Sequence, residues 1–442
     1  MKLAKYLFIF LSLSYLICGQ VLSADCDDAS GTVTISTSCT ALDISGDGSN
    51  VTVNSGVTID STSIAVKTPN ATNATITNNG TFSASGSSGL RNTYPGHISN
   101  LINTGSITAG DNDGIRNGGT ITTLTNSGTI SAAADHGIKN LTGSGRSIGT
   151  LTNSGTISAG DDFGIRNDGI IGTLTNSGTI SAVDDQGLWT KGTITTLTNS
   201  GTISVGDEYA IKNVNGTIGT LTNSGTISAG DRYGLFNDQN STDTATITTL
   251  TNSGTISANR SGIWNDATIT TLTNSGNIKA LTGDFGLKNV NGTIGTLTNS
   301  GTISAGDDYG LYNDGTATIT TLTNTGTISA SGNGISIWND STSTINTLNN
   351  SQGASSSALT YKGTLPTNYN VIVNSTSDFG KTTFSDVSGT TNFGVHSSST
   401  LAGSTTYSSV LSGLSSSEIA SGTSGSLVAG STRRDWTLSN SS

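Results

Sequence analysis

Pairs of neighbouring carboxylates recur along the chain, and their types and spacing could support chemistry. Two close carboxylates can bind calcium or act together as general acid and base. However, aspartate also closes turns through its own backbone, and a catalytic site is normally singular, so the repetition favours turn chemistry. We therefore predict no catalytic residues and no metal site. The pairs are Asp111 with Asp113, Asp161 with Asp162, Asp184 with Asp185, Asp207 with Glu208, and Asp307 with Asp308.

The other candidates for chemistry are three histidines, His97, His136 and His396, which lie in unlike contexts. His136 occupies a corner position where other units carry an aromatic residue such as Phe163 or Tyr209, so we predict a corner side chain. The sequence has no G-x-S-x-G nucleophile elbow and no phosphate-loop or dinucleotide fingerprint. We expect no enzyme activity and no cofactor.

One large basic or aromatic side chain in each unit gives the most suggestive pattern for binding. It directly follows the inward apolar residue of the unit's second strand. Aromatic faces stack on sugar rings, and cations lie over aromatic faces, so the pattern predicts a stripe that holds a glycan or a cell-surface ligand. Packing along an exposed sheet face would produce the same pattern. The candidate stripe residues are Arg116, Lys139, Arg166, Trp189, Lys212, Phe236, Trp264, Lys288, Tyr312 and Trp338.

The elements that carry these side chains follow from an internal repeat. The phrase L-x-N-S/T-G-x-I recurs in steps of 22 to 29 residues, about 25 on average. Inside a unit, apolar and polar residues alternate, which places Leu297, Ile303, Leu311 and Ile319 inward. Short alternating strands bounded by Gly, Asn and Asp predict an all-β fold, a parallel β-helix (β-solenoid) with one coil per unit. The phrase begins at Leu101, Leu124, Leu151, Leu174, Leu197, Leu221, Leu250, Leu272, Leu297 and Leu322.

Stacking is needed because one coil cannot bury its few apolar side chains. At about 4.8 Å per coil, about fourteen coils would make a rod on the order of 70 Å long. The asparagine of the phrase should form a hydrogen-bonded column, and we expect the glycine after it to adopt a positive φ. The asparagines are Asn126, Asn153, Asn176, Asn199, Asn223, Asn252, Asn274 and Asn299.

Composition and charge narrow the function. Charged residues make up only 11% of the chain, and the net charge is −11. This balance argues against nucleic acid as a partner, because binding phosphates needs Lys and Arg. The regular apolar positions argue against a disordered chain.

The N-terminus is predicted to be a secretory signal peptide, residues 1–24, because Lys2 and Lys5 precede a short apolar run. Cys18 leaves lipidation open as an alternative. In an exported protein, Cys26 and Cys39 are expected to form a disulfide worth about 3 kcal/mol. We predict an N-terminal cap over residues 25–56, the regular solenoid over 57–353, and irregular C-terminal coils with a junction segment over 354–442.

The signal peptide, the "NSGTIS" coils and the C-terminal stretch from Tyr407 to Asn440 together resemble the passenger region of bacterial autotransporters, which are type V secreted surface proteins. The resemblance is one of repeat style. It implies a right-handed β-helix carried to the cell surface, and a C-terminal outer-membrane barrel as partner, which is not present in this chain.

We therefore expect an exported, non-enzymatic protein at the cell surface, in the outer membrane or outside the cell. It would act as an adhesin or a displayed rod that binds glycans or surfaces. A secreted polysaccharide lyase or hydrolase is the first alternative, since some parallel β-helices have those activities. An ice-binding or filament-forming rod is the second, because outward threonine pairs recur along the coils.

Overall fold

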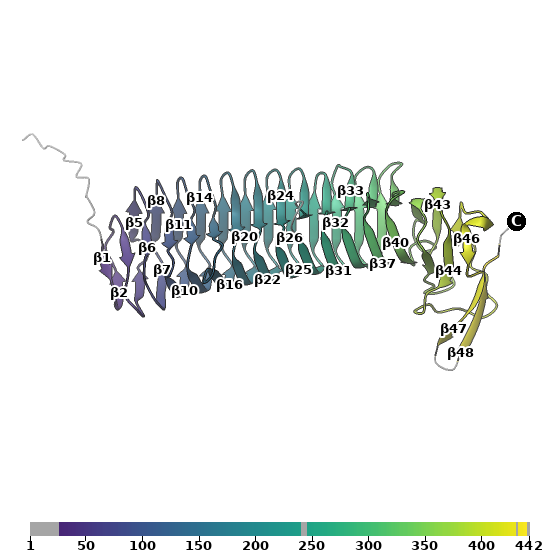
Figure 1. Ribbon diagram of the computed structural model, residues 1–442, viewed down its shortest axis with the longest axis horizontal. Helices are drawn as coiled ribbons and strands as arrows, with labels where there is room; N and C mark the ends of the chain where they lie inside the picture. Colours follow the sequence, from purple (N-terminus) through teal and green to yellow (C-terminus); the bar gives the residue numbers. More distant parts are fainter. Residues whose placement is uncertain (1–25, 240–244, 430–431, 440–442) are drawn as a thin grey trace, which may run out of the picture.

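The computed structural model describes residues 26–239, 245–429 and 432–439, and it shows one long parallel β-solenoid (Figure 1). The predicted fold class is confirmed. The predicted signal peptide at residues 1–24 lies outside the described residues. The only helix within the described ranges is a short 3-10 turn, η1 (Ser416–Glu418).

Three parallel sheets run along the rod. Most coils contribute one strand to each of them, whereas the coils at both ends have no strand in sheet C. Sheet B runs from β2 (Thr32–Ile35) to β46 (Ile419–Ser421), and sheet C from β5 (Thr58–Ser61) to β38 (Thr327–Ala330). Sheet A carries the predicted stripe. Its strands are β1 (Cys26–Ala29), β3 (Leu42–Ile44), β6 (Val66–Thr68), β9 (Leu90–Asn92), β12 (Ile115–Asn117), β15 (Ile138–Asn140), β18 (Phe163–Asn167), β21 (Gln186–Thr190), β24 (Tyr209–Val214), β27 (Tyr233–Asp238), β30 (Ser261–Asn265), β33 (Phe285–Val290), β36 (Tyr309–Asp314), β39 (Ile335–Asn339), β41 (Leu359–Thr364), β43 (Thr382–Ser388) and β45 (Leu411–Ser412).

A central coil shows how the repeat phrase folds. It consists of β22 (Thr193–Asn199), β23 (Thr202–Val205) and β24, and each strand pairs in parallel with its counterpart one coil later. The register places Leu over Leu and Ile over Ile, as in Leu197 over Leu221. These side chains are fully buried, so the core is a set of apolar ladders, as the alternation predicts.

The predicted asparagine column is confirmed, and a second column accompanies it. At the end of sheet B, the Asn199 side-chain amide donates to Asn223 Oδ1 at 2.8 Å, and the other members repeat this bond. At the end of sheet A, Asn213 donates to Asn237 in the same way, also at 2.8 Å. The second column has only one interruption between Asn92 and Asn339, at Thr190.

This interruption gives a first testable prediction, that Thr190→Asn stabilises the protein. Thr190 accepts a hydrogen bond from Asn167 at 3.1 Å, but it leaves the buried Oδ1 of Asn213 without a donor. An asparagine would supply that donor, so we expect about 1 kcal/mol of added stability. Urea unfolding followed by circular dichroism would measure the change. An unchanged or lower urea midpoint would contradict the prediction. Thr222→Asn makes the same substitution on the outside of sheet B and serves as the control.

The glycine that follows the asparagine–serine pair does not have the expected positive φ, and that prediction is wrong. Gly201 and Gly225 are absent from the residues with left-handed backbone in the described chain. Instead, a Cβ at Gly225 would collide with the carbonyl oxygen of Gly201 in the preceding coil. Glycine is required here because two backbones approach closely at the corner.

Parallel pairing of strands continues beyond both ends of the predicted regular solenoid, residues 57–353. At the N-terminal end, β1 pairs with β3, and Cys26 and Cys39 are joined by a disulfide with Cα atoms 5.6 Å apart. At the C-terminal end, β41 pairs with β43, while an antiparallel hairpin of β47 (Ser424–Ala429) and β48 (Thr432–Thr437) projects from the rod (Figure 1). In the described part of the chain, no helix has the length and apolar character needed to cross a membrane.

Candidate binding surface

The structure places all the predicted stripe residues in one column on the outside of sheet A. Each pairs in register with the next, from Arg116 through to Trp338. The column also continues beyond the predicted set, to Lys67 and Arg91 at one end and Lys362 at the other. All the predicted stripe side chains are half-buried, so each one presents only part of its surface to solvent.

A second column lies beside the stripe, and we call it the corner row; most of its side chains are buried. It arises because a small residue, such as Gly164 between Phe163 and Ile165, turns inward at the start of the strand. The strand bends there, so Phe163 and Arg166 both face outward although regular alternation would separate them. The corner row consists of His136, Phe163, Gln186, Tyr209, Tyr233, Ser261, Phe285, Tyr309 and Ile335.

Rings of the stripe and the corner row pack into an almost continuous aromatic layer. Trp264 stacks on Tyr233 with ring centroids 4.6 Å apart, and Trp338 stacks on Tyr312 at 4.8 Å. Phe285 lies 5.2 Å from Tyr312 and joins the two groups. Burial raises the pKa of Tyr233 to about 12, so its hydroxyl stays neutral. This packing fixes the rings. Tyr233 and Phe285 are buried, whereas the half-buried rings of the stripe present part of their surface to solvent.

Two lysines of the stripe, Lys212 and Lys288, are embedded in this aromatic layer, and each has its own carboxylate. Lys288 Nζ lies 4.4 Å from the ring centroid of Trp264 and 4.9 Å from that of Tyr312. It also pairs with Asp314 at 3.2 Å. Lys212 is held in the same way, 5.3 Å from the Phe236 ring centroid and 3.6 Å from Asp238. The positive charge of these lysines is therefore compensated within the stripe.

The aromatic part of the stripe repeats every third coil. Along the column, Trp189, Lys212 and Phe236 are followed by Trp264, Lys288 and Tyr312, and then by Trp338 and Lys362. We call the first two sets Trp–Lys–aromatic triplets, and the third is an incomplete triplet because Ser385 follows Lys362 in the column. Residues 209–238 and 285–314, which lie three coils apart, are nearly identical in sequence. A comparison of single units does not reveal this three-coil repeat. The triplets follow one another at about 14 Å, three coils of about 4.8 Å each.

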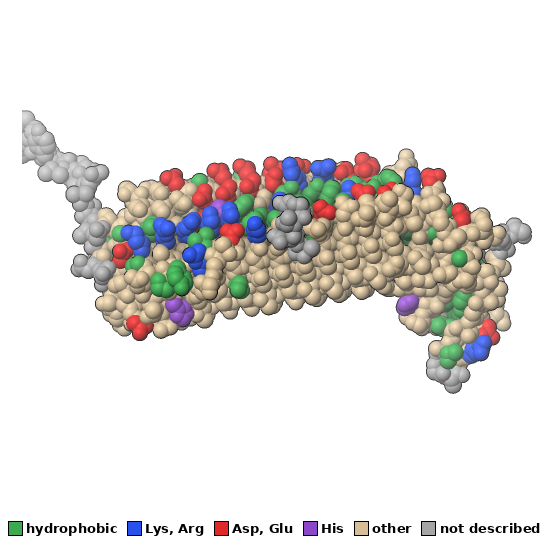
Figure 2. Space-filling view, viewed as in Figure 1, with side chains coloured by type: hydrophobic (Ala, Val, Ile, Leu, Met, Phe, Trp, Pro, Cys, Tyr) green, Lys and Arg blue, Asp and Glu red, His purple; other side chains and the backbone are tan. Residues whose placement is uncertain are grey.

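The N-terminal part of the stripe has a different chemistry. Five successive coils present Lys67, Arg91, Arg116, Lys139 and Arg166. Figure 2 shows Lys and Arg along this half of the rod, with hydrophobic side chains gathered further along and a row of acidic residues at the adjoining edge. The stripe thus changes from basic to aromatic along the rod.

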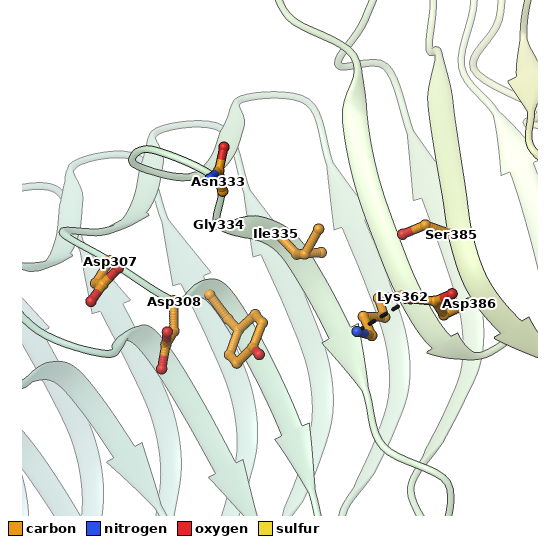
Figure 3. A pocket seen from close by; sticks show the side chains of 9 residues that line it. Asp307, Asp308, Asn333, Gly334, Ile335, Lys362, Ser385 and Asp386 are labelled. Atoms are coloured by element: carbon orange, nitrogen blue, oxygen red, sulfur yellow. Dashed lines mark ion pairs between the residues drawn. The ribbon is translucent and has the colours of Figure 1, made fainter.

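A shallow hollow of about 400 Å³ lies at the C-terminal end of the stripe (Figure 3). Asp307 and Asp308 border one side, and Lys362 and Asp386 form an ion pair of 3.4 Å at the other. Lys362 Nζ also lies 5.6 Å from the ring centroid of Trp338. The hollow therefore adds polar groups to the end of the aromatic surface.

The predicted acidic pairs lie along the corner that precedes sheet A, and they do not form one cluster. Most of these carboxylates are exposed or half-buried, whereas Asp113 is fully buried. Burial and neighbouring carboxylates raise the pKa of Asp185 and Asp308. Each pair belongs to its own coil, which agrees with a repeated role at turns.

Two of the histidines contact hydroxyl groups at the surface. A ring nitrogen of His97 lies 2.8 Å from Thr122 Oγ1, and one of His396 lies 2.7 Å from Ser398 Oγ. Within the described ranges, neither histidine has a carboxylate ion-pair partner that would complete a triad. His136 lies elsewhere, in the corner row, next to Phe163.

Comparison with known proteins provides no relative from which a ligand could be transferred. The surface is thus defined by its own geometry: a solenoid face on which rings and compensated cations recur at a fixed interval. No protein-family model, no curated protein and no solved structure matches the chain.

Proposed function

We propose that this protein is a non-enzymatic, exported rod that binds an extended glycan along the aromatic part of the stripe. The observation that carries the proposal is the Trp–Lys–aromatic triplet that recurs every third coil. Ring faces fixed at regular intervals suit a ligand that is itself long and repetitive, because successive sugars can stack on successive rings.

The charges of the stripe favour a neutral glycan. Lys212, Lys288 and Lys362 each have a carboxylate within 3.6, 3.2 and 3.4 Å respectively. A uronic acid or sulfate group would have to displace that carboxylate or approach the acidic row beside the stripe. Neutral hydroxyls can instead share the existing ion pairs as donors and acceptors. The hollow lined by Lys362, Asp386 and Asp308 offers such groups to one end of the glycan.

Binding is expected to fail when the three tryptophans of the triplets are removed together. Replacing Trp189, Trp264 and Trp338 with alanine removes three stacking faces, each worth about 1 kcal/mol. We expect about a 100-fold loss of affinity, measured on an array of neutral and acidic glycans and then by calorimetry with the best ligand.

The matched control removes three exposed apolar side chains away from the stripe, Ile170, Val183 and Leu281. Binding should be unchanged in this control, and both variants should keep the circular dichroism of the parent. Equal affinity of the parent and the tryptophan variant, or no binding to any glycan, would contradict the proposal.

We also propose that the rod is displayed at the cell surface in the manner of an autotransporter passenger. The solenoid fold and the resemblance of its coils support this proposal. The test is antibody staining and protease treatment of intact source cells. Staining without permeabilisation would support display, and staining that appears only after permeabilisation would contradict it.

A further inference from the structure

His136 is a buried histidine without hydrogen-bond partners. It follows β14 (Thr129–Ala132) and belongs to the corner row, where its ring packs edge-on against Phe163 with centroids 5.0 Å apart. Only 1% of the residue is exposed, and neither ring nitrogen has a hydrogen-bond partner. Leaving such a group unpaired is costly, so the ring is expected to have a partner that protein atoms do not supply.

Carboxylates from neighbouring coils converge on this ring. Nδ1 of His136 lies 3.5 Å from Asp113 Oδ1 and 3.6 Å from Asp162 Oδ2. Candidate ligand atoms of Asp113, Asp135 and His136 all lie within 4.8 Å of one another. The Asp113 residue is fully buried, and its Oδ1 also has no hydrogen-bond partner. Two unpaired buried groups, an imidazole and a carboxylate, thus face the same point.

We propose that His136, Asp113, Asp135 and Asp162 bind a divalent transition-metal ion of the zinc class. The distances between ligand atoms suit such an ion, because bonds of about 2.1 Å in a tetrahedron separate two ligands by about 3.4 Å. An imidazole nitrogen with carboxylate oxygens is a ligand set for zinc or cobalt, whereas calcium takes oxygen ligands.

The surroundings prepare these groups to act as ligands. Arg116 donates to Asp113 Oδ2 at 2.9 Å, so the second oxygen, Oδ1, remains free to face the ring. The cationic side chains of Lys139, Arg166 and Arg116 lie near the ring. Since the same cations oppose a metal ion, we expect weaker binding than at a closed cysteine site.

The site is singular, unlike the repeated acidic pairs. At the position of His136, the later coils carry Phe163, Gln186, Tyr209 and other residues that cannot supply an imidazole. Its ligands come from three successive coils, those of β12, β15 and β18. A bound ion would therefore link these coils in the basic part of the stripe, one ring away from the first triplet, because Phe163 contacts both His136 and Trp189. The proposal is independent of glycan binding.

The test uses the full mature chain without a histidine tag, stripped with a chelator and then titrated with Co²⁺. We expect one equivalent to bind with the strong visible absorption of a tetrahedral site, Zn²⁺ to displace it, and elemental analysis to find one zinc per chain after loading. His136→Phe should abolish the absorption and lower zinc affinity at least tenfold. Phenylalanine already occupies this row at Phe163, so the variant is expected to fold.

A second ligand variant, Asp113→Asn, keeps the side-chain volume and should also lower affinity at least tenfold. His396→Gln is the control, because it removes a surface histidine in a distant coil, and it should bind like the parent. Absence of stoichiometric Co²⁺ or Zn²⁺ binding in the parent would overturn the proposal. So would parent-like binding by folded His136→Phe and Asp113→Asn.

Discussion

Replacing Gly225 with alanine is expected to destabilise the rod by about 2–4 kcal/mol, although the change adds one methyl group. A Cβ at Gly225 would collide with the carbonyl oxygen of Gly201 and with the backbone of Ser200. These atoms belong to the preceding coil, and they are backbone, so they cannot rotate away. The two coils would have to separate at this corner, which weakens the hydrogen bonds of the sheets on either side.

Chemical unfolding followed by circular dichroism would measure this effect against Gly403→Ala. Gly403 also has an ordinary backbone conformation, but an added Cβ there would meet only the tip of Arg434 at 3.8 Å. The control should change stability by no more than about 0.5 kcal/mol. Equal stabilities of the two variants would show that the coils can separate at little cost, contrary to the prediction.

The core could be predicted from sequence because its cause is periodic. Leu197 and Ile203 recur at the same place in every unit, and a position that recurs in every coil forms a ladder when the coils stack. The role of Gly201 and Gly225 could not be predicted in the same way. Whether a glycine serves a positive φ or a close backbone approach depends on the distance between coils, which one unit does not reveal.

The stripe was predictable for the same reason, whereas its neighbours were not. Arg166 and Trp189 occupy equal positions in successive units, so their alignment follows from the repeat. Phe163 lies three residues before Arg166, and strict alternation would place it on the opposite face. The inward turn of Gly164 brings both to one side. Contacts between the two columns therefore depend on a bend that the alternation pattern does not encode.

The histidine cluster shows a different limit of sequence reasoning. The chain separates Asp113, His136 and Asp162 by whole coils, so no local motif joins them. Their positions in the repeat indicate neighbouring corners, but the same corners elsewhere hold Tyr209 or Phe285 without a ligand role. What separates this corner from the others is an imidazole with unpaired nitrogens that faces the unpaired Oδ1 of Asp113.

Replacing Asn199 with alanine is also expected to destabilise the rod by about 2–4 kcal/mol, through lost hydrogen bonds. Asn199 Oδ1 accepts from Asn176 at 2.8 Å, and its amide donates to Asn223 Oδ1 at 2.8 Å and to the Thr226 carbonyl at 3.1 Å. Truncation to alanine leaves these buried groups with fewer hydrogen-bond partners. Each group left unsatisfied is expected to cost about 1–3 kcal/mol of stability.

Two further variants separate hydrogen bonding from a general effect of substitution. Asn199→Thr should reduce the free energy of unfolding less than Asn199→Ala does. A threonine can take the place of asparagine in such a column, because Thr190 in the sheet A column accepts a hydrogen bond from Asn167. Asn259→Ala removes an exposed amide from a central corner and should cost no more than about 0.5 kcal/mol. An Asn199→Ala variant as stable as Asn259→Ala would show that the column contributes little.

The position of Asn199 along the rod predicts how the Asn199→Ala variant unfolds. In a stack where each coil contacts only its neighbours, stability is a sum of coil and interface contributions. A defect at the central coil of Asn199 weakens the coupling between the two halves, so they should unfold in separate steps. The same change at Asn103, near the N-terminal end, should release only a short segment. Hydrogen exchange resolved along the chain would show which segments open together in each variant. A single cooperative opening of the whole rod in both variants would contradict the prediction, because it would require coupling beyond adjacent coils.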